Sequence, residues 1–412
     1  MTKKIPLPPP YSHIYRHKVL PEVTHDENAR MNFIANLNIH IGSILFPGVS
    51  DSYKNRIEPE FIEKNGRKPS TSIEVRNIIK KDIIYQTWSA VRRNTMEMRH
   101  QIGRSIVFRQ INKLISNAKK LNAGSKNLEL DNTVKVPEYL SAIDNHCMPG
   151  SYYTEVMDDD ISAPANYEAG HFTTVAGGTG PKSDIIGRAM STWLKQNLKD
   201  LKPKVIYDIG AGAGINTLPI ASLYPEAKVF ALDIAAPMLR YGHARAMDMG
   251  VNNVIFKQVD FENFNFNPNS VDLIISAMFF HEVSAKALRN IFRKSFELLK
   301  PGGLMLHMEQ PNFDSDTEAF EKFVRDWDAW YNGEPYWAKL HNLNIIDEMI
   351  KSGFLQNNTF ETSQHIDRHD KSYPHWAGLF SRHAHEAKMR ENKEKNNPKN
   401  DGGIYMFGAF KK

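Results

Sequence analysis

A glycine-rich turn at the end of an apolar segment constrains the fold of this chain more than any other feature. Residues 205–214 read VIYDIGAGAG, in which a run rich in β-branched residues contains one acidic residue, Asp208, and leads into Gly210, Gly212 and Gly214. The next segment has the periodicity of a helix. We therefore predict a buried parallel strand, a tight turn and a helix N-terminus, because glycines accept positive φ angles and let a ligand approach the main chain.

A second carboxylate marks the end of the next predicted strand. Asp233 closes the segment KVFALD, about twenty residues after the turn, which is the spacing at which a carboxylate meets ribose hydroxyls. A dinucleotide-binding turn would need its third glycine at position 215, where this chain has Ile215. Asp208, just before the first glycine, would also repel a pyrophosphate and attract a cationic group. The pattern predicts the nucleoside-binding half of a doubly wound α/β sheet.

Further segments continue this arrangement in order: Asp260 and Phe261 after a strand from Val254 to Val259, a fourth strand at 271–280, and LLKPGGLMLHMEQP at 298–311. Together with the glycine turn and Asp233, they resemble the motifs of class I S-adenosylmethionine-dependent methyltransferases, over roughly residues 180–320. The resemblance implies a mostly parallel seven-stranded sheet and S-adenosyl-L-methionine as the cofactor. It implies these cofactor-binding residues: Asp208, Gly210, Gly212, Gly214, Asp233, Ile234, Asp260, Phe261 and Met278.

Each of these elements also has a simpler explanation when it is taken alone. A short glycine motif is often only a tight turn. Asp233 could cap a helix that starts near Ala236 and Pro237, and Asp260 could open a turn. These explanations account poorly for all the elements occurring together in family order, so we favour the methyltransferase-type cofactor site.

The length of the chain, 412 residues, exceeds what a single hydrophobic core usually holds. We predict an N-terminal helical region for substrate binding or as a lid (1–121), an irregular connection covering the cofactor site (122–180), and a methyltransferase domain (181–412) with an insertion at 367–401. Within the connection, the candidate cover residues are Tyr152, Tyr153 and Phe172, although such aromatics also pack between domains. We expect the N-terminal region and the insertion to close over the carboxyl edge of the sheet and to form the acceptor pocket.

Composition favours a soluble cytoplasmic protein, since 41% of the residues are hydrophobic and 24% are charged. The single cysteine, Cys147, excludes an internal disulfide and a zinc site built from several cysteines. The N-terminal lysines are not followed by the apolar segment of a signal peptide. The apolar stretch Phe33 to Phe46 contains polar residues and is expected to stop at Pro47, too short to span a bilayer. We therefore expect no membrane partner, while the oligomeric state stays open.

The catalytic candidates are His281 and Glu309, with Glu282 beside His281 at the end of the fourth strand. Methyl transfer from a sulfonium is an in-line displacement, so positioning is the main catalytic effect. A base is needed only when the acceptor must lose a proton. His281 directly follows the fourth strand and Glu309 closes the fifth, on the same strand face as His307. We predict His281 as the base because imidazole titrates near neutral pH, with a purely packing or hydrogen-bonding role as the alternative.

A metal site is a rival interpretation of the histidines near the C-terminus. Two pairs have ligand-like spacing and a fifth histidine lies between them: His365, His369, His375, His383 and His385. Such spacings arise easily by chance in a chain with 16 histidines, and no HExxH motif is present. We therefore expect no metal.

The residues after the fourth strand constrain the nature of the acceptor. Methyltransferases of adenine and cytosine amines typically carry N/D-P-P-Y/F/W there, whereas residues 276–280 read SAMFF. Nucleic-acid amines are therefore disfavoured. The basic stretch at 76–120 could bind phosphates, form a solvated helix face, or hold an acidic small molecule. We predict a small-molecule acceptor, aromatic or carboxylated. The alternatives are an RNA methyltransferase that uses residues 76–120 and a regulatory protein that binds S-adenosylmethionine without catalysis.

Overall fold

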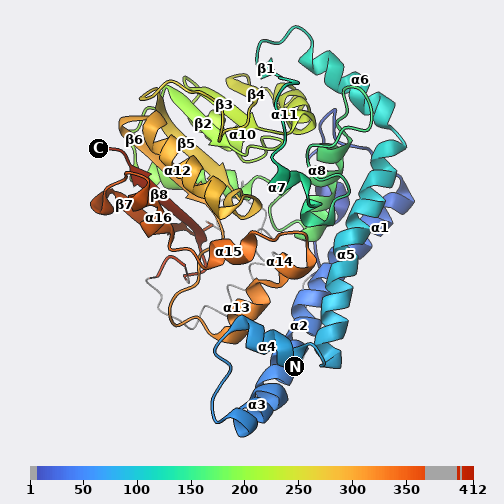
Figure 1. Cartoon of the computed structure of the whole chain (residues 1–412). Coiled ribbons are helices and arrows are strands. Elements are labelled where there is room, and N and C mark those ends of the chain that lie inside the picture. Colours follow the sequence, from blue (N-terminus) through green and yellow to red (C-terminus); the bar gives the residue numbers. More distant parts are fainter. Residues whose placement is uncertain (1–6, 367–396, 400) are drawn as a thin grey trace.

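The centre of the structure is an eight-stranded sheet in the order β1-β4-β3-β2-β5-β6-β8-β7 (Figure 1). The computed structural model describes residues 7–366, 397–399 and 401–412. Neighbouring strands from β1 to β6 are parallel, and β8 runs antiparallel to both of its neighbours. The strands are β1 (Leu128–Glu129), β2 (Val205–Ile209), β3 (Lys228–Asp233), β4 (Val254–Gln258), β5 (Val271–Ala277), β6 (Leu299–Met308), β7 (Thr359–Gln364) and β8 (Ile404–Phe410).

The predicted α/β class with a mostly parallel sheet is confirmed, and the strand count differs by one. The eighth strand is β1, a two-residue strand from the segment predicted to be irregular, which pairs with the edge of β4. A strand this short carries no alternation of polar and apolar residues, so the sequence gives no sign of it. The sheet reverses its order at β2, which lies between β3 and β5. A crevice at the carboxyl ends of the strands is expected at such a point.

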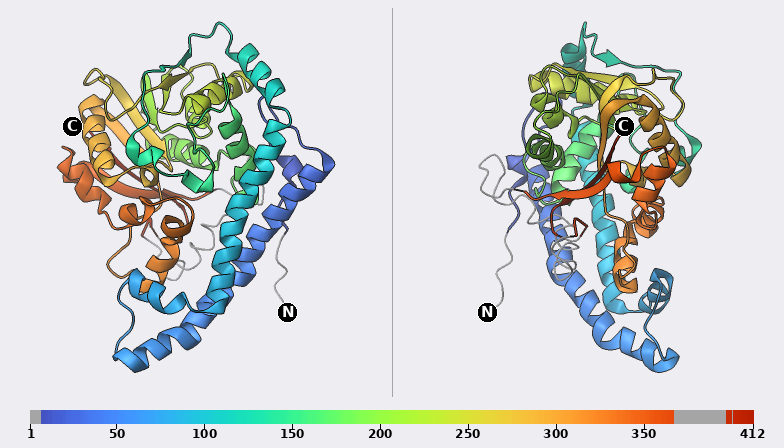
Figure 2. Two further views of the ribbon diagram at one scale, coloured as in Figure 1. Left: turned by 45° about the vertical axis from the view of Figure 1, so that its right-hand side comes forward. Right: turned by 90° about the vertical axis from the view of Figure 1, so that its left-hand side faces the viewer.

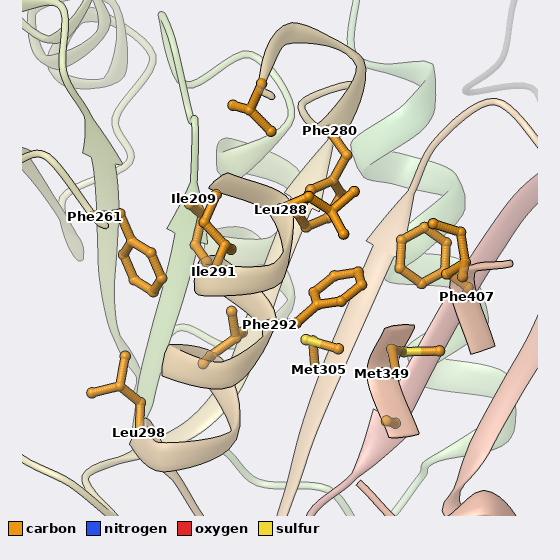
Figure 3. Close-up of a cluster of buried hydrophobic side chains, with 14 of the residues drawn as sticks. Ile209, Phe261, Phe280, Leu288, Ile291, Phe292, Leu298, Met305, Met349 and Phe407 are labelled. Carbon is orange, nitrogen blue, oxygen red and sulfur yellow. The ribbon is translucent and has the colours of Figure 1, made fainter. Parts of the chain in front are cut away.

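Helices cover both faces of the sheet. One face packs against α9 (Ile185–Asn197), α10 (Thr217–Leu223) and α11 (Ala236–Asp248), and the other against α12 (Ala285–Leu298) and α16 (Ile345–Lys351). Figure 3 shows how α12 directs Leu288, Ile291 and Phe292 toward Ile209 and Met305 of the strands. Burying each such side chain stabilises the fold by roughly 1.5–3 kcal/mol. The rigid sheet that results fixes the strand ends at which the site is built.

The N-terminal region begins with one long helical run, His25–Asn65, made of α1 (His25–His40), α2 (Phe46–Ser52) and α3 (Glu58–Asn65). The predicted stop at Pro47 is wrong. Pro47 and Pro59 each lie just after a π-helical turn, Ile41–Leu45 and Tyr53–Ile57. The wider π turn accommodates a proline that lacks its N–H and would clash with the preceding turn of a regular α-helix.

Because the helix continues through both prolines, it is longer than the sequence suggested. The run has 41 residues and includes a stretch with a mean hydropathy of 1.3. About 33% of that stretch is buried inside the structure. By length and composition, the helix could cross a membrane. Core helices of soluble proteins meet the same criterion. The cytoplasmic location therefore stays a prediction.

The remaining N-terminal helices are α4 (Ser72–Ile79), α5 (Ile83–Phe108) and α6 (Ile111–Asn122). Helix α5 lies beside α1 along one side of the molecule (Figure 2), and α6 packs on α11 of the sheet domain. Three short helices connect β6 to α16: α13 (Ala319–Arg325), α14 (Trp327–Tyr331) and α15 (Trp337–His341). The N-terminal helices therefore brace the domain from the side.

The segment 122–180 is not wholly irregular as predicted, because it contains α7 (Glu138–Ser141) and the longer α8 (Ser162–Thr174). Helix α8 packs against α1, α5 and α11 and is buried nearly all round. A helix buried on all sides shows no amphipathic periodicity, which is why the sequence did not reveal it. The predicted insertion, 367–401, lies almost entirely outside the described residues.

A buried carboxylate on α8 joins three parts of the chain. Glu168 accepts hydrogen bonds from Tyr241 Oη at 2.7 Å and Arg245 Nε at 3.0 Å, both on α11, and its Oε2 lies 3.1 Å from His17 Nε2. The side chains of His17, Glu168 and Arg245 are at most 2% exposed. Burial would raise the pKa of Glu168, but Arg245 and His17 more than offset this and hold its pKa far below the usual range. Residues 122–180, called the covering segment from here on, are thus tied to the sheet domain by a charged network.

We expect Glu168→Gln to lower the free energy of unfolding by about 3 kcal/mol, because it leaves the buried Arg245 without its charge partner. Glu97→Gln, which removes the partly exposed partner of Arg93 on the same helix, is the matched control and should cost no more than about 1 kcal/mol. Urea unfolding of both variants measures the difference. Equal small losses would show that the network contributes little.

Candidate active site

The glycine turn lies between the carboxyl ends of β2 and β3, as predicted. Gly210, Gly212 and Gly214 have φ angles of 65°, 52° and 68°, which side-chain-bearing residues rarely adopt. The N–H of Gly212 donates to Asp233 Oδ2 at 2.7 Å, and the N–H of Ala235 donates to Oδ1 at 2.8 Å. No atom lies within 4 Å of where a Cβ of Gly212 would stand. The turn is therefore held by Asp233 and leaves open space beside its main chain.

That space belongs to a cavity of about 230 Å³ at the carboxyl edge of the sheet. Seven of the predicted cofactor residues line it: Gly210, Gly212, Asp233, Ile234, Asp260, Phe261 and Met278. Met278 has a φ of 54°, so the backbone turns sharply where β5 ends. The carboxylate of Asp233, the open space at Gly212 and the apolar Phe261 together fit a nucleoside with a ribose and a flat base.

The other two predicted cofactor residues lie behind this wall. Asp208 is 3% exposed and accepts a hydrogen bond from Thr217 Oγ1 at 2.5 Å. Burial raises its pKa to about 7, and Asp233 adds to this effect. A Cβ on Gly214 would come within 2.8 Å of the Phe256 ring. In this structure both residues shape the turn from beneath, and neither lines the cavity.

The opposite wall comes from the covering segment. It consists of residues of 137–171: Pro137, Tyr139, Leu140, Asn145, Ser151, Tyr152, Tyr153, Tyr167 and His171. Of the predicted cover residues, Tyr152 and Tyr153 line the cavity, whereas Phe172 is fully buried against Tyr11. Among the described residues, none of the cavity lining comes from 1–121. The N-terminal helices brace the cover instead of forming the pocket wall, because α8 stands between them and the cavity.

His281 and Glu309, the predicted catalytic pair, form a buried ion pair with Nδ1 of His281 2.9 Å from Oε1 of Glu309. Glu309 also accepts the N–H groups of Phe280 and Gln310. Burial would lower the pKa of His281, but Glu309 more than offsets this and raises the pKa to about 9. His281 is 1% exposed and does not line the cavity. The neighbouring Glu282 does line the cavity, and its Oε1 lies 3.7 Å from His281 Nε2. His307 lies elsewhere, bonded to Ser276.

Sequence reasoning missed the groups that surround Glu282. This carboxylate lines the cavity, accepts a hydrogen bond from Tyr152 Oη at 3.0 Å and from the amide of Asn145, and contacts Nε2 of His146 at 3.3 Å. Glu282 lies next to His281 in the sequence, but His146 is far away in the covering segment. The single available signal was the histidine in the Gly- and Pro-rich stretch near 150, and nothing in the sequence pairs it with Glu282.

The C-terminal histidines do not supply a metal site in the described part of the chain. His365 is 64% exposed and lies 3.4 Å from Asp401. The other four, at 369, 375, 383 and 385, lie outside the described residues.

Part of the sheet domain matches a family of known proteins. Residues 206–303 match the model of the methyltransferase domain family. The ubiquinone/menaquinone biosynthesis C-methyltransferase of Pseudomonas savastanoi pv. phaseolicola is 38% identical over 124 residues, which are 29% of this chain and 47% of that protein. The corresponding enzyme of Ectopseudomonas mendocina is 30% identical over 173 residues, or 41% and 59%. This chain thus spans about half the length of the curated relatives it matches.

Among solved structures, phosphoethanolamine N-methyltransferase 2 of Haemonchus contortus in complex with S-adenosyl-L-methionine aligns at 17% identity with a TM-score of 0.37, over 58% of this chain and 57% of that chain. The family match and the sheet topology together identify the class. Residues 206–303 belong to the class I S-adenosylmethionine-dependent methyltransferases.

We expect Asp233→Ala to weaken binding of S-adenosylhomocysteine by roughly 1.5–3 kcal/mol, the contribution of a hydrogen bond to a charged group. Asp248→Ala, at the C-terminal end of α11 and outside the cavity lining, is the control and should leave the affinity unchanged. Titration calorimetry measures both. An unchanged affinity in a folded Asp233→Ala variant would contradict the assignment of this carboxylate to the cofactor.

The raised pKa of Asp208 predicts a pH-dependent stability. Because the folded state binds this proton more tightly than the unfolded chain, its stabilising effect is complete below about pH 4 and is lost as the pH rises through about 7. Asp208→Asn should therefore be more stable than the wild type at pH 8, by on the order of 2–4 kcal/mol, and similar at pH 4. Denaturant unfolding at both pH values tests this, with exposed Asp51→Asn as the control. A constant difference across the range would refute it.

Proposed function

We propose that this protein is an S-adenosylmethionine-dependent methyltransferase that acts on a small-molecule acceptor, aromatic or carboxylated. One observation carries the proposal. A single cavity reaches from the glycine turn, at Gly212 and Asp233, to the covering segment at Tyr152 and Tyr167. Donor and acceptor would therefore share one enclosed space, which methyl transfer requires.

The side chains around the acceptor end suit a flat molecule that carries a polar group. Tyr139, Tyr152 and Tyr167 offer ring faces and edges, and Glu282 presents a carboxylate to the same space. When bound, S-adenosylmethionine supplies the electrophilic methyl group. The protein orients the acceptor, excludes water and accepts a hydrogen bond or a proton at Glu282. The role of His281 as a base stays a prediction, because His281 does not line the cavity and is connected to it through Glu282.

The basic stretch 76–120 gives little support to an RNA substrate. Arg92 and Arg99 are each 5% exposed, and Arg92 pairs with Asp328 at 3.0 Å. Other members form ion pairs at the surface: Arg93 with Glu97, Arg109 with Glu27, Lys113 with Glu22 and Lys119 with Asp159. Cations that already have carboxylate partners gain less from phosphates. This favours the small-molecule proposal over the RNA methyltransferase alternative.

The curated relatives suggest where to begin the search for the acceptor. Their names place them in ubiquinone and menaquinone biosynthesis as C-methyltransferases. A quinone ring is flat and carries oxygen atoms. Such a ring would suit the tyrosine walls and the carboxylate of Glu282. Ring-hydroxylated aromatic compounds are therefore the first class to test.

The test combines cofactor binding with a search for the acceptor. Calorimetry should show binding of S-adenosylhomocysteine, and incubation of the protein with methyl-labelled S-adenosylmethionine and a metabolite extract should label a small molecule. The Asp233→Ala variant is the matched control and should reduce labelling. Binding without any labelled product would favour the regulatory alternative, and label in RNA would favour the RNA alternative. Absence of cofactor binding would overturn the proposal.

A further inference from the structure

We propose that His146, His281 and Glu282 bind a divalent transition-metal ion beside the cavity, at the place where Glu282 lines it. The three residues come from two distant parts of the sequence. His146 belongs to the covering segment, and His281 and Glu282 follow β5. One potential ligand atom from each lies within 4.8 Å of the others. The two walls of the cavity therefore meet at a set of groups that metals commonly bind.

The distances between the ligand atoms suit a small ion. The Nε2 atoms of His146 and His281 lie 3.3 Å and 3.7 Å from Glu282 Oε1. Ligands about 2.1 Å from a metal in tetrahedral or octahedral geometry are about 3.0–3.5 Å from one another. Small side-chain rotations would bring all three atoms to bonding distance of one ion.

Both histidines are oriented in the way that metal-binding histidines usually are. Nδ1 of His281 faces Glu309 Oε1 at 2.9 Å, and Nδ1 of His146 faces Glu334 Oε1 at 2.7 Å. A carboxylate at Nδ1 fixes the tautomer that leaves Nε2 free for a metal, and it increases the basicity of the ring. The cluster contains two such carboxylate–histidine pairs. The Nε2 atoms of both histidines face Oε1 of Glu282.

Glu334 adds buried negative charge beside the cluster. Its side chain is fully buried, its Oε1 lies 2.7 Å from His146 Nδ1, and its Oε2 has no hydrogen-bond partner among the described residues. Burying a carboxylate with a single partner is costly. Three carboxylates, Glu282, Glu309 and Glu334, surround the two imidazoles, and a divalent ion between the rings offsets this negative charge.

The ligand set indicates the kind of metal. Two imidazoles and one carboxylate suit Zn²⁺, Fe²⁺, Mn²⁺ or Co²⁺, whereas Mg²⁺ and Ca²⁺ prefer oxygen ligands alone. Glu282 lines the cavity, so the remaining coordination positions of the ion would face the acceptor space. If the proposed function holds, an oxygen atom of the acceptor would occupy one of them. The competing explanation is a metal-free network in which the two histidines pair with glutamates as imidazolium ions.

Metal analysis of the full-length protein tests the site directly. The protein is stripped with a chelator, dialysed, and titrated with Co²⁺ and Zn²⁺, with metal content measured by mass spectrometry and Co²⁺ ligation by visible absorption. We expect one ion per chain. His146→Ala and Glu282→Gln should weaken the affinity at least 100-fold, and Glu334→Gln should weaken it about 10- to 100-fold. His243→Gln, a buried histidine outside the cluster, should bind the metal like the wild type.

Either of two results would overturn the proposal: no saturable binding to the folded wild-type protein, or equal affinity in the wild type and the His146→Ala and Glu282→Gln variants. Thermal unfolding establishes that each variant is folded. Calorimetry with S-adenosylhomocysteine on the metal-free protein separates this proposal from the proposed function. Cofactor binding without metal binding refutes the metal site alone. Metal binding without cofactor binding refutes the methyltransferase proposal alone and leaves the metal site supported.

Discussion

The position of the covering segment over the sheet depends on one buried ionic network. Glu168 on α8 accepts hydrogen bonds from Arg245 and Tyr241 of α11 and contacts His17, which precedes α1. A buried carboxylate is stable only when opposite charge and hydrogen bonds surround it. Glu168 therefore has all its partners only when the segment around His17, the covering segment and the sheet domain are assembled together. This constraint, together with the hydrogen bonds from Tyr152 and Asn145 to Glu282, holds the wall formed by residues 137–171 opposite the glycine turn.

Different parts of the chain form the two walls of the cavity and support them. The ends of β2 to β5 provide one wall of the cavity, at the glycine turn, Asp233 and Asp260. The covering segment provides the tyrosines of the other wall, and Glu282 stands where the two walls meet. The long N-terminal helices pack behind α8 and do not reach the cavity in the described structure. Their contribution is to hold α8 in place, which differs from the pocket-forming role expected from their aromatic and basic residues.

The sequence predicted the elements whose pattern is local. The strands β2 to β6 and the glycine turn were recognisable because β-branched runs, turn residues and helical periodicity lie within a few residues of one another. Features set by tertiary packing were not recognisable. Helix α8 is buried on nearly all sides, the π turns before Pro47 and Pro59 leave no sequence signature, and β1 has only two residues. The meeting of His146 with Glu282 depends on how the chain folds back on itself, so no spacing rule could predict it.

The wall at the glycine turn and the covering segment line one shared cavity. Hydrogen exchange measured by mass spectrometry, with and without S-adenosylhomocysteine, tests this claim most directly, because amides in contact with a ligand or closed over it exchange more slowly. If the two walls enclose the ligand together, exchange slows both in the glycine turn around 210–214 and in the covering segment around 145–171, with little change in α3 and α4. Slower exchange in the turn alone, with the cover unchanged, would contradict it.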